Sequence, residues 1–412
     1  MSAYRLLIAN HAVEIGGAER VLLRFLERID RGLLEPALAC PHPGPLSEEA
    51  EKLGLRVHFG YPASRLLEVR RKSLGGGRLS VLAYPYDIAR TVCGLARLLR
   101  KGGYDLVLTN SAKADIYGSL AARLAGIPVV WRLHDIVDSD AFSRLNIALF
   151  RFFATFFAAK VLAVSGAVRD ALVARGVRGD KIAVVYNGID IAALARTAQR
   201  EEARAEWGLE GDAPVAGMVG RLVDWKGPDR FLEAAAKVSG DIPRARFMLV
   251  GDAIFGEAGY LGELKEMAVR LGLGERAVFT GFREDALRIM SGLDVLVHAS
   301  LLPDPLPTVL IEAMALGLPV VAADAGGVRE IVREGSTGLV VPPGDVRAMS
   351  EAMEELLSDP EEAARMGRAG RELAAERFDI DRQARRLEEE MLAALPRGMR
   401  ERGAEDRAAR DS

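Results

Sequence analysis

Apolar runs of strand length alternate with amphipathic, helix-forming runs along almost the whole chain. Strands are expected at residues 5–9, 36–39, 56–59, 106–109, 129–133, 161–164, 182–185, 215–219, 246–250, 277–280, 295–297, 319–323 and 338–341. Strands that alternate in this way with helices are typical of parallel sheets covered by helices on both faces. The sequence therefore predicts an α/β protein.

The chain is too long for a single hydrophobic core. It has 412 residues, whereas single cores stop growing at roughly 250–300 residues. Around residues 199–212 the sequence becomes polar and charged, and the alternation then restarts. We expect an N-terminal doubly wound domain at residues 1–198 and a second one at 199–375. A helix at 376–395 and a disordered tail at 396–412, almost without apolar residues, should follow.

Composition argues against several classes of protein. The net charge is −3, so no general positive field is available for nucleic acid. Cys40 and Cys93 show no paired spacing, which argues against a disulfide framework or a zinc site and fits a reducing cytoplasm. The first apolar run has the length of a strand and lacks the pattern of a signal peptide. We expect a cytoplasmic protein; the oligomeric state is not predicted.

One stretch, residues 148–165, is strongly apolar, but Arg151 and Lys160 interrupt it. A membrane span needs about 20 mainly apolar residues, so we predict a helix followed by a strand. The stretch contains five phenylalanines: Phe150, Phe152, Phe153, Phe156 and Phe157. They are either core residues or the lipid-facing side of an interfacial helix, which leaves a peripheral contact with the inner face of the cell membrane open.

Residues 298–330 carry the clearest functional pattern. After a strand and a loop with three prolines, a helix is expected from Thr308 to Leu316, with Thr308 as its N-cap. The free N–H groups and the positive dipole end of such a helix favour an anion such as a diphosphate. Asp304 lies in the loop, and Glu312 is placed one turn into the helix to accept hydrogen bonds from sugar hydroxyls. A helix start with a surface charge is the alternative.

Two other strand-to-helix turns suit a phosphate. Gly16 and Gly17 follow the first strand, and paired glycines let phosphates approach the backbone closely. Arg221 and Lys226 lie at the two ends of the loop after residues 215–219. A guanidinium fork and an ammonium point charge together suit a diphosphate. Ordinary turn chemistry and a solvated basic loop are the alternatives.

Two short motifs lie after the strand at residues 129–133. His134 is just past its end, where open α/β sheets place ligand-binding residues. Asp138-Ser139-Asp140 imitates a D-x-D metal motif, but short acidic pairs arise often by chance, and this one precedes a helix that it could cap. We therefore expect no metal site.

Together these motifs resemble the family four retaining glycosyltransferases. The resemblance covers residues 1–390 and rests on Gly16-Gly17, His134, Val164-Ser165, Asn187-Gly188-Ile189-Asp190, Gly220-Arg221, Lys226-Gly227, Val250-Gly251-Asp252, Phe279-Thr280-Gly281, Asp304 and Glu312-Ala313-Met314-Ala315. It implies the GT-B fold, in which two Rossmann-like, doubly wound domains face each other across a cleft. A C-terminal helix crosses back to the first domain.

The resemblance also implies roles for individual residues. Arg221 and Lys226 would bind the donor diphosphate as it leaves, His134 would touch the donor sugar, and Glu312 would bind the ribose. The catalytic residues implied are Arg221, Lys226, Asp304 and His134. The donor-binding residues implied are Gly16, Gly17, Gly220, Gly281, Phe282, Arg283, Leu306, Pro307, Thr308, Val309 and Glu312.

The chain departs from the family pattern at Asp304, where the family usually has Glu. Asp is one methylene shorter but keeps the charge and the hydrogen-bonding ability, so we retain Asp304 as a contact to the donor sugar. The glycine-rich segment that usually follows is replaced by Leu306-Pro307-Thr308.

The reaction implied is transfer of a sugar from a nucleoside diphosphate sugar to a hydroxyl, with retained anomeric configuration and without a cofactor. The implied acceptor is a glycan or a lipid-linked molecule in bacterial lipopolysaccharide, capsule or glycolipid assembly. The loop at residues 66–86, with its glycines and basic residues, should shape the acceptor site. A GT-B nucleotide-sugar epimerase and a catalytically weak nucleotide-sugar-binding protein are the alternatives.

Overall fold

The chain folds into two compact units. The computed structural model describes residues 3–61, 78–137, 144–197, 199–209, 211, 213–253 and 259–401. Unit 1 consists of Met1–Gly188 and Ile380–Ser412, and unit 2 consists of Ile189–Asp379.

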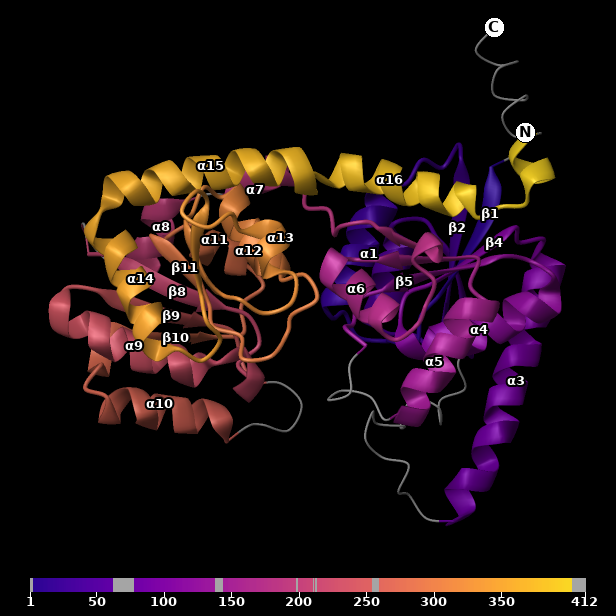
Figure 1. Cartoon of the computed structure of the whole chain (residues 1–412), viewed down its shortest axis with the longest axis horizontal. Helices are drawn as coiled ribbons and strands as arrows, with labels where there is room; N and C mark the ends of the chain where they lie inside the picture. Colours follow the sequence, from indigo (N-terminus) through magenta and orange to yellow (C-terminus); the bar gives the residue numbers. More distant parts are fainter. Residues whose placement is uncertain are drawn as a thin grey trace, which may run out of the picture. The chain divides into compact units, whose positions relative to one another are not determined.

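Unit 1 is built on a seven-stranded sheet with the order β3-β2-β1-β4-β5-β6-β7 (Figure 1). All neighbouring strands in it are parallel. Its elements are β1 (Tyr4–Ala9), α1 (Gly17–Arg28), β2 (Leu34–Cys40), α2 (Pro45–Lys52), β3 (Arg56–Phe59), α3 (Arg78–Gly102), β4 (Leu106–Thr109), α4 (Ala112–Ala125), β5 (Val129–Leu133), α5 (Arg144–Phe156), β6 (Lys160–Ala163), α6 (Gly166–Ala174), β7 (Ile182–Val184) and, from the C-terminal part, α16 (Ile380–Ala393).

Unit 2 repeats this plan with a six-stranded parallel sheet in the order β10-β9-β8-β11-β12-β13. Its elements are α7 (Ile191–Thr197), α8 (Arg200–Glu206), β8 (Val215–Val219), α9 (Pro228–Asp241), β9 (Arg246–Val250), α10 (Tyr260–Arg270), β10 (Ala277–Gly281), α11 (Ala286–Met290), β11 (Val295–His298), α12 (Thr308–Ala315), β12 (Val320–Ala323), α13 (Val328–Ile331), β13 (Gly338–Val341), α14 (Val346–Ser358) and α15 (Pro360–Phe378).

The strands are apolar on both faces because each sheet is covered on both sides. In β1, Leu6, Leu7 and Ile8 are all fully buried, so successive side chains on opposite faces both lie in a core. In unit 2 the rings of Phe231 from α9 and Phe247 from β9 meet edge to face at 6.4 Å. These cores confirm the predicted fold class.

Each sheet reverses its direction of winding once. In unit 1 the reversal lies between β1 and β4, and in unit 2 between β8 and β11. In open α/β sheets, ligands bind at such a reversal point, outside the carboxyl ends of the strands.

The chain returns to unit 1 through α16, which packs along α1 (Figure 1). The Glu388 carboxylate accepts a 2.7 Å hydrogen bond from the backbone N–H of Asp30, and Glu390 pairs with Lys160. The Tyr4 hydroxyl donates to the carbonyl of Met399 at 2.7 Å. The expectation of a disordered tail at 396–412 is therefore wrong for residues 396–401, which this contact helps to hold, and residues 402–412 lie outside the described residues.

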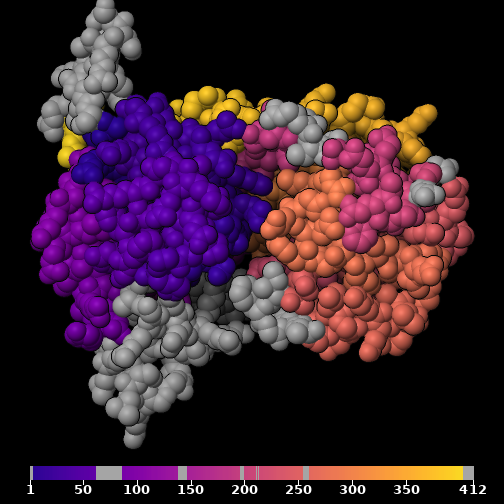
Figure 2. Space-filling view, turned by 180° about the vertical axis from the view of Figure 1, so that it is seen from behind, coloured from indigo at the N-terminus to yellow at the C-terminus, as the bar shows by residue number. Residues whose placement is uncertain are grey.

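The domain boundary differs from the compositional one at residue 199. Helix α7 precedes that boundary, and α8 follows it directly. Both helices pack on unit 2, against α11, and α7 also contacts α12. In the space-filling view the pink residues of this segment lie on the orange residues of unit 2 (Figure 2). The polar composition around residue 199 predicted an exposed linker there. Unit 2 begins earlier because the apolar sides of these helices are buried against it. At the other end, the division at Asp379 and Ile380 lies close to the expected start of the last helix at 376.

Two other expectations need correction. Helix α3 begins at Arg78, so residues 78–86 are helical and do not belong to the loop expected at 66–86; residues 62–77 lie outside the described residues. Thr308 is the first residue of α12 and Pro307 is the N-cap, because proline at this place ends the preceding loop in an extended conformation.

Among the described residues, none of the helices combines the length and the apolar character that crossing a membrane requires. The phenylalanines of α5 do not share one environment. Phe150 is buried, whereas Phe152 and Phe156 are 48% and 71% exposed.

The close approach of Gly220 and Gly251 gives a test of the fold of unit 2. Gly251 has φ +141°, and a Cβ atom there would lie 1.8 Å from the Gly220 carbonyl oxygen. We expect Gly251→Ala to lower the free energy of unfolding by about 2–3 kcal/mol, through backbone strain and steric conflict. Urea denaturation monitored by circular dichroism measures this.

Gly240→Ala is the matched control. Gly240 lies exposed near the end of α9, has no positive φ, and has open space where a Cβ would go. This substitution should raise the free energy of unfolding by up to about 1 kcal/mol, since Ala is the better helix former. Equal effects of the two substitutions would contradict the proposed close approach.

Candidate functional site

The candidate site of unit 2 lies where the loops after β8 and β11 meet. These strands are neighbours in the sheet, with Val295 paired to Ala216. The loops stay together because the N–H of Leu301 donates to the carbonyl of Trp225 at 2.8 Å. Gly227 allows this approach, since a Cβ there would lie 2.3 Å from the Ala299 carbonyl oxygen.

A charged pair joins the same two loops. The Lys226 ammonium donates to the Asp304 carboxylate, and its Nζ lies 4.5 Å from the centroid of the Trp225 ring. Nε2 of His298, at the end of β11, lies 3.5 Å from Oδ2 of Asp304. The Asp304 residue is only 8% exposed, so this carboxylate relies on its two neighbours for compensation.

Burial and charge set the protonation states of this group. Burial opposes ionisation of Asp304, but His298 and the positive charge of Lys226 outweigh it and hold the pKa of Asp304 below its usual range. Burial, assisted by the charge of Lys226, lowers the pKa of His298, against the opposing effect of Asp304. At neutral pH, Asp304 is therefore a carboxylate and His298 a neutral imidazole.

Two glycines fix the backbone of Asp304. The N–H of Gly327 donates to the Asp304 carbonyl at 2.8 Å, and the N–H of Asp304 donates to the Ala325 carbonyl at 3.4 Å. Gly326 has φ +70°, and a Cβ there would lie 2.0 Å from the Asp304 carbonyl oxygen. The loop after β12 thus sets the position of Asp304 from the side opposite Lys226.

Helix α12 presents one accessible face. Leu310, Ile311, Ala313, Met314 and Ala315 are buried, whereas Thr308, Val309 and Glu312 are partly exposed and lie within one helical turn of one another. The N-cap, Pro307, makes no side-chain hydrogen bond to the first turn. The first-turn N–H groups of α12 begin four residues after Asp304, the partner of Lys226, and the N-terminus of a helix favours an anion.

Arg221 differs from Lys226 in its environment. Its side chain is exposed, and no acidic partner is recorded for it within the part of the chain that the structure describes. Gly220, just before it, has φ +145° and donates its N–H to the Val250 carbonyl at 2.9 Å. A free guanidinium and a positioned ammonium thus lie in one loop.

The segment Gly281-Phe282-Arg283 provides an exposed ring. Gly281 has φ +70°, and its carbonyl accepts from the N–H of Gly251 at 3.0 Å. Phe282 is 60% exposed. The Arg283 guanidinium, however, pairs with Asp285 at 2.8 Å and with Glu206 at 2.9 Å. Within the described residues this guanidinium is already bound, so the exposed Phe282 ring and the backbone are the accessible groups of this segment.

In unit 1, Gly16 and Gly17 begin α1 at the carboxyl end of β1. Glu19 organises this turn: one carboxylate oxygen accepts from the Gly16 N–H and the other from the Asn10 side-chain amide, both at 3.2 Å. A Cβ at Gly16 would lie 2.9 Å from the Glu19 carboxylate, whereas Gly17 faces open space. Gly17 therefore leaves the backbone accessible, as phosphate approach requires.

His134 follows β5 in the same unit. Its Nε2 lies 3.0 Å from the side-chain oxygen of Asn110, which follows β4. Burial, with the nearby charge of Arg132, lowers the pKa of His134 to about 3. The imidazole is therefore neutral at physiological pH, with Nε2 as the donor to Asn110.

Sequence reasoning missed a group of buried polar residues at the strand ends. In unit 1 the Thr109 hydroxyl donates to Asp115 at 2.5 Å, and burial raises the pKa of Asp115 well above its usual value. Five buried side chains each have at least one polar atom without a hydrogen-bond partner among the described residues: those of Asn110, Asp115, Arg132, His298 and Ser300. Thr109, Asn110, His298 and Ser300 each lie at or just after a predicted strand end, and that position is the signal that would have found them.

The predicted site residues thus fall into two groups. Gly16, Gly17 and His134 lie in unit 1, and all the others lie in unit 2, where Lys226, Asp304 and the start of α12 come together. The described residues contain no set of three or more His, Cys, Asp or Glu side chains placed to hold a metal ion. Asp138-Ser139-Asp140 lies outside the described residues.

Comparison with known proteins gives one consistent result. The family model described as "Glycosyltransferase Family 4" matches residues 15–193, and the one described as "Glycosyl transferases group 1" matches residues 199–373. Both units are therefore covered by glycosyltransferase families.

Curated relatives and solved structures agree. The chain is 30% identical over 344 residues to a GDP-mannose-dependent alpha-mannosyltransferase of Mycobacterium tuberculosis (strain CDC 1551 / Oshkosh), covering 81% of this chain and 82% of that protein. It is 27% identical over 355 residues to the UDP-Gal:alpha-D-GlcNAc-diphosphoundecaprenol alpha-1,3-galactosyltransferase of Escherichia coli, covering 84% and 86%. The crystal structure of Anabaena Alr3699/HepE in complex with UDP-glucose is similar with a TM-score of 0.79 and 30% identity, covering 95% of this chain and 100% of that one.

These findings confirm the predicted fold and class of enzyme. The two parallel-sheet, Rossmann-like units have the GT-B fold, and the protein is a glycosyltransferase that uses nucleotide sugars. The chain belongs to glycosyltransferase family 4.

Proposed function

We propose that the enzyme transfers a sugar from a nucleoside diphosphate sugar to a hydroxyl of a lipid-linked or glycan acceptor, with retained anomeric configuration and without a metal ion. The observation that carries this proposal is the loop after β8, which presents the exposed guanidinium of Arg221 and the ammonium of Lys226. The Lys226 ammonium pairs with Asp304, four residues before α12 begins. This combination of two cations and a helix N-terminus is matched to a diphosphate leaving group.

The leaving diphosphate is stabilised by fixed charges. Breaking the sugar–phosphate bond places negative charge on the diphosphate and positive charge on an oxocarbenium-like ring. An ammonium has three N–H donors, so Lys226 can keep its bond to Asp304 while it donates to a phosphate oxygen. Arg221 and the first N–H groups of α12 complete the set of donors, and preorganised donors of this kind stabilise developing charge strongly.

Asp304 acts in two ways in this mechanism. Its carboxylate orients the Lys226 ammonium, and its negative charge lies near the developing positive charge of the sugar ring. The shorter side chain of Asp, compared with the usual Glu, is offset by the tight backbone position that Gly326 and Gly327 impose. Glu312, on the same face of α12 as Thr308, is the proposed ligand of the ribose hydroxyls.

His134 contributes as a neutral hydrogen-bonding group in the proposed reaction. Its lowered pKa keeps it uncharged, so it contacts the sugar hydroxyls without adding positive charge beside an oxocarbenium-like ring. A phosphate oxygen of the leaving group takes the acceptor proton on the same face of the sugar. No dedicated protein base is then required, in contrast to the two-carboxylate scheme of glycoside hydrolases.

The classes of donor and acceptor follow the relatives. One relative is named for GDP-mannose, another for UDP-galactose and a diphosphoundecaprenol acceptor, and HepE is solved with UDP-glucose. We therefore place the reaction in bacterial lipopolysaccharide, capsule or glycolipid assembly, at the cytoplasmic face of the membrane.

The proposal is tested by incubating the protein with UDP-glucose, UDP-galactose and GDP-mannose, with and without polyprenyl diphosphate-linked sugars. Nuclear magnetic resonance of the product should show transfer or slow hydrolysis with retained anomeric configuration. An inverted product would contradict the mechanism. Formation of an epimer would favour the epimerase alternative, and binding without turnover would favour the binding-protein alternative.

Removing the Lys226 ammonium should abolish most of the turnover. We expect Lys226→Ala to lower kcat by roughly 100- to 1,000-fold, as expected for loss of one charge-stabilising donor. Steady-state release of the nucleoside diphosphate measures this. The exposed Lys237 of α9 is the control, and Lys237→Ala should leave kcat unchanged.

Lys226→Ala also leaves the buried Asp304 carboxylate without its cation, which should lower the free energy of unfolding. The double variant Lys226→Ala, Asp304→Asn removes the unpaired carboxylate, so it should regain stability without regaining turnover. Recovery of turnover in the double variant would contradict a direct role of the ammonium.

Turnover should not depend on a divalent metal. We expect full activity in the presence of excess EDTA, because Arg221, Lys226 and the start of α12 neutralise the diphosphate in place of a divalent metal ion. Activity that EDTA abolishes and Mn²⁺ restores would contradict this prediction.

A further inference from the structure

Helix α5 of unit 1 carries an apolar stripe that faces away from the core. Leu149, Phe152 and Phe156 are 43%, 48% and 71% exposed. Their spacing of three and four residues places them along one side of the helix. On the opposite side Phe150 and Ala154 are buried, and the ring of Phe150 meets that of Trp131 edge to face, with the centroids 4.9 Å apart. The stripe is therefore not needed for packing in unit 1.

The exposed rings are clustered. The ring of Phe152 lies 5.1 Å from that of Phe156 and 5.7 Å from that of Phe153, and the rings of Phe153 and Phe157 lie 4.9 Å apart. Contiguous exposed apolar patches on soluble proteins mark interaction sites more often than isolated apolar residues do. This cluster needs an explanation beyond the core of the unit.

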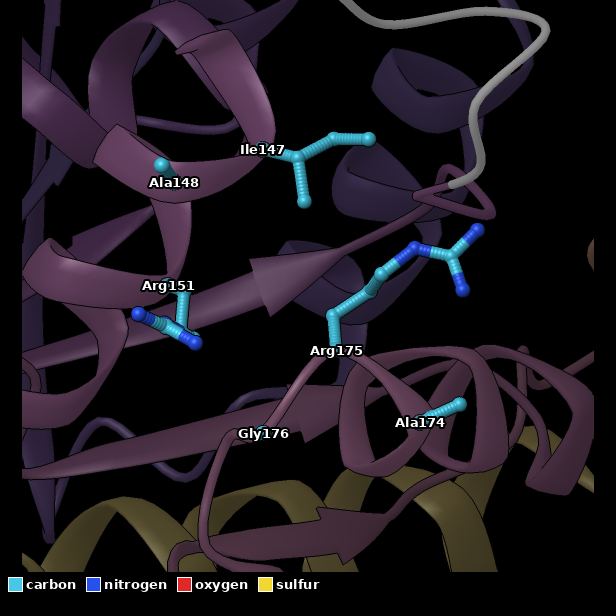
Figure 3. Close-up of a pocket in the computed structure, with 6 residues that line it drawn as sticks. All are labelled: Ile147, Ala148, Arg151, Ala174, Arg175 and Gly176. Atoms are coloured by element: carbon cyan, nitrogen blue, oxygen red, sulfur yellow. The ribbon is translucent and has the colours of Figure 1, made fainter. Parts of the chain in front are cut away.

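A pocket of about 420 Å³ lies on the flank of the same helix. Ile147, Ala148 and Arg151 of α5 line one side, and Ala174, Arg175 and Gly176 at the end of α6 line the other. Figure 3 shows the side chains of Ile147 and Arg175 extending into the same space, with Arg151 at its other side. The pocket therefore combines apolar walls with two guanidinium groups.

These two arginines differ from the basic residues around them. Arg169 pairs with Asp170, Arg178 pairs with Asp180, and the Lys181 ammonium donates to the Ala158 carbonyl at 3.0 Å. For Arg151 and Arg175 no acidic partner is recorded in the described part of unit 1. Two unpaired guanidiniums at one pocket are suited to an anionic phosphate group.

We propose that the stripe and the pocket together form a docking surface for a bilayer that contains anionic phospholipid. Leu149, Phe152 and Phe156 enter the boundary between headgroups and acyl chains, and the phosphate of one headgroup binds between Arg151 and Arg175. An aromatic stripe flanked by cations is the pattern of a helix that lies in the membrane interface. A protein partner would match the rings but would not explain two unpaired cations beside them. The proposed function explains why the enzyme would need a membrane contact, and the inference rests on it in that respect alone.

Sedimentation with lipid vesicles tests the surface directly on the full-length protein. Vesicles of phosphatidylcholine with about one third phosphatidylglycerol should bind the protein, and vesicles of phosphatidylcholine alone should bind it at least tenfold more weakly. Each basic residue near an anionic surface is worth about a fivefold change in partition. Arg151→Glu, Arg175→Glu should therefore reduce binding to the anionic vesicles by more than roughly 25-fold.

A matched control separates this site from general charge. Arg270→Glu, Arg347→Glu makes the same change in net charge at exposed arginines of α10 and α14 in unit 2. It should bind anionic vesicles within about twofold of the parent, in contrast to the fivefold change expected per contacting residue. Equal loss in both double variants would overturn the proposed site.

The apolar stripe has its own test. Phe152→Ser, Phe156→Ser should weaken binding to anionic vesicles at least tenfold, with an unchanged thermal midpoint because both rings are exposed. Phe156→Trp adds one tryptophan to the parent protein. The difference between the fluorescence of this variant and that of the parent should shift to the blue when anionic vesicles are added. Parent binding that survives the loss of both rings, or added fluorescence that does not shift, would overturn insertion of the stripe.

The outcomes also distinguish this proposal from the enzymatic one. The Phe and Arg double variants should hydrolyse UDP-glucose at the parent rate, whereas Lys226→Ala should bind vesicles like the parent. The parent could instead fail to bind vesicles and self-associate in a way that the Phe double variant abolishes. That result would show that the stripe packs against a second copy of the chain. It would overturn the membrane proposal and leave the transferase proposal intact.

Discussion

The ion pair of Lys226 with Asp304 is the interaction on which the donor side of this enzyme depends. It joins the loops that follow β8 and β11, the two strands at which the sheet of unit 2 changes its direction of winding. Both partners are largely buried, so each charge needs the other, and His298 stabilises the carboxylate further. The Lys226 ammonium is thereby fixed to the loop that leads into α12.

Glycines make this arrangement geometrically accessible. Gly227, Gly251 and Gly326 each bring one loop backbone into contact with another, at places where a Cβ atom would collide with a carbonyl oxygen. The loops after β8, β9, β11 and β12 are thereby linked to one another at the carboxyl end of the sheet. These links bring together backbone N–H groups and charged side chains from separate segments, which is what a charge-stabilising site requires.

Unit 1 places neutral side chains at its strand ends, beside the buried charge of Arg132. Asn110 and Asp115 surround the end of β4, and His134 is held neutral by burial and by Arg132. In the proposed reaction, unit 2 would meet the diphosphate and unit 1 the sugar hydroxyls. Phosphate oxygens need cations, whereas sugar hydroxyls need hydrogen-bonding groups that do not repel a positively charged ring.

The sequence alone determined the fold class, the family, and most of the strands, because apolar periodicity and glycine-rich turns are local properties of the chain. Arg56–Phe59, Leu106–Thr109 and Val215–Val219, for example, were predicted with the bounds that the structure shows. Motifs such as Arg221 with Lys226 were also recognisable, since both residues lie in one loop.

Only the tertiary structure decided which residues are partners. In the folded chain Lys226 pairs with Asp304, and the Arg283 guanidinium pairs with Asp285 and Glu206. His298 lies next to Asp304, and Asn110 lies next to His134. The tertiary structure also separated Phe150, in the core, from Phe152 and Phe156, on the surface. Burial and pairing depend on segments far apart in the chain, and no local pattern encodes the distance between them.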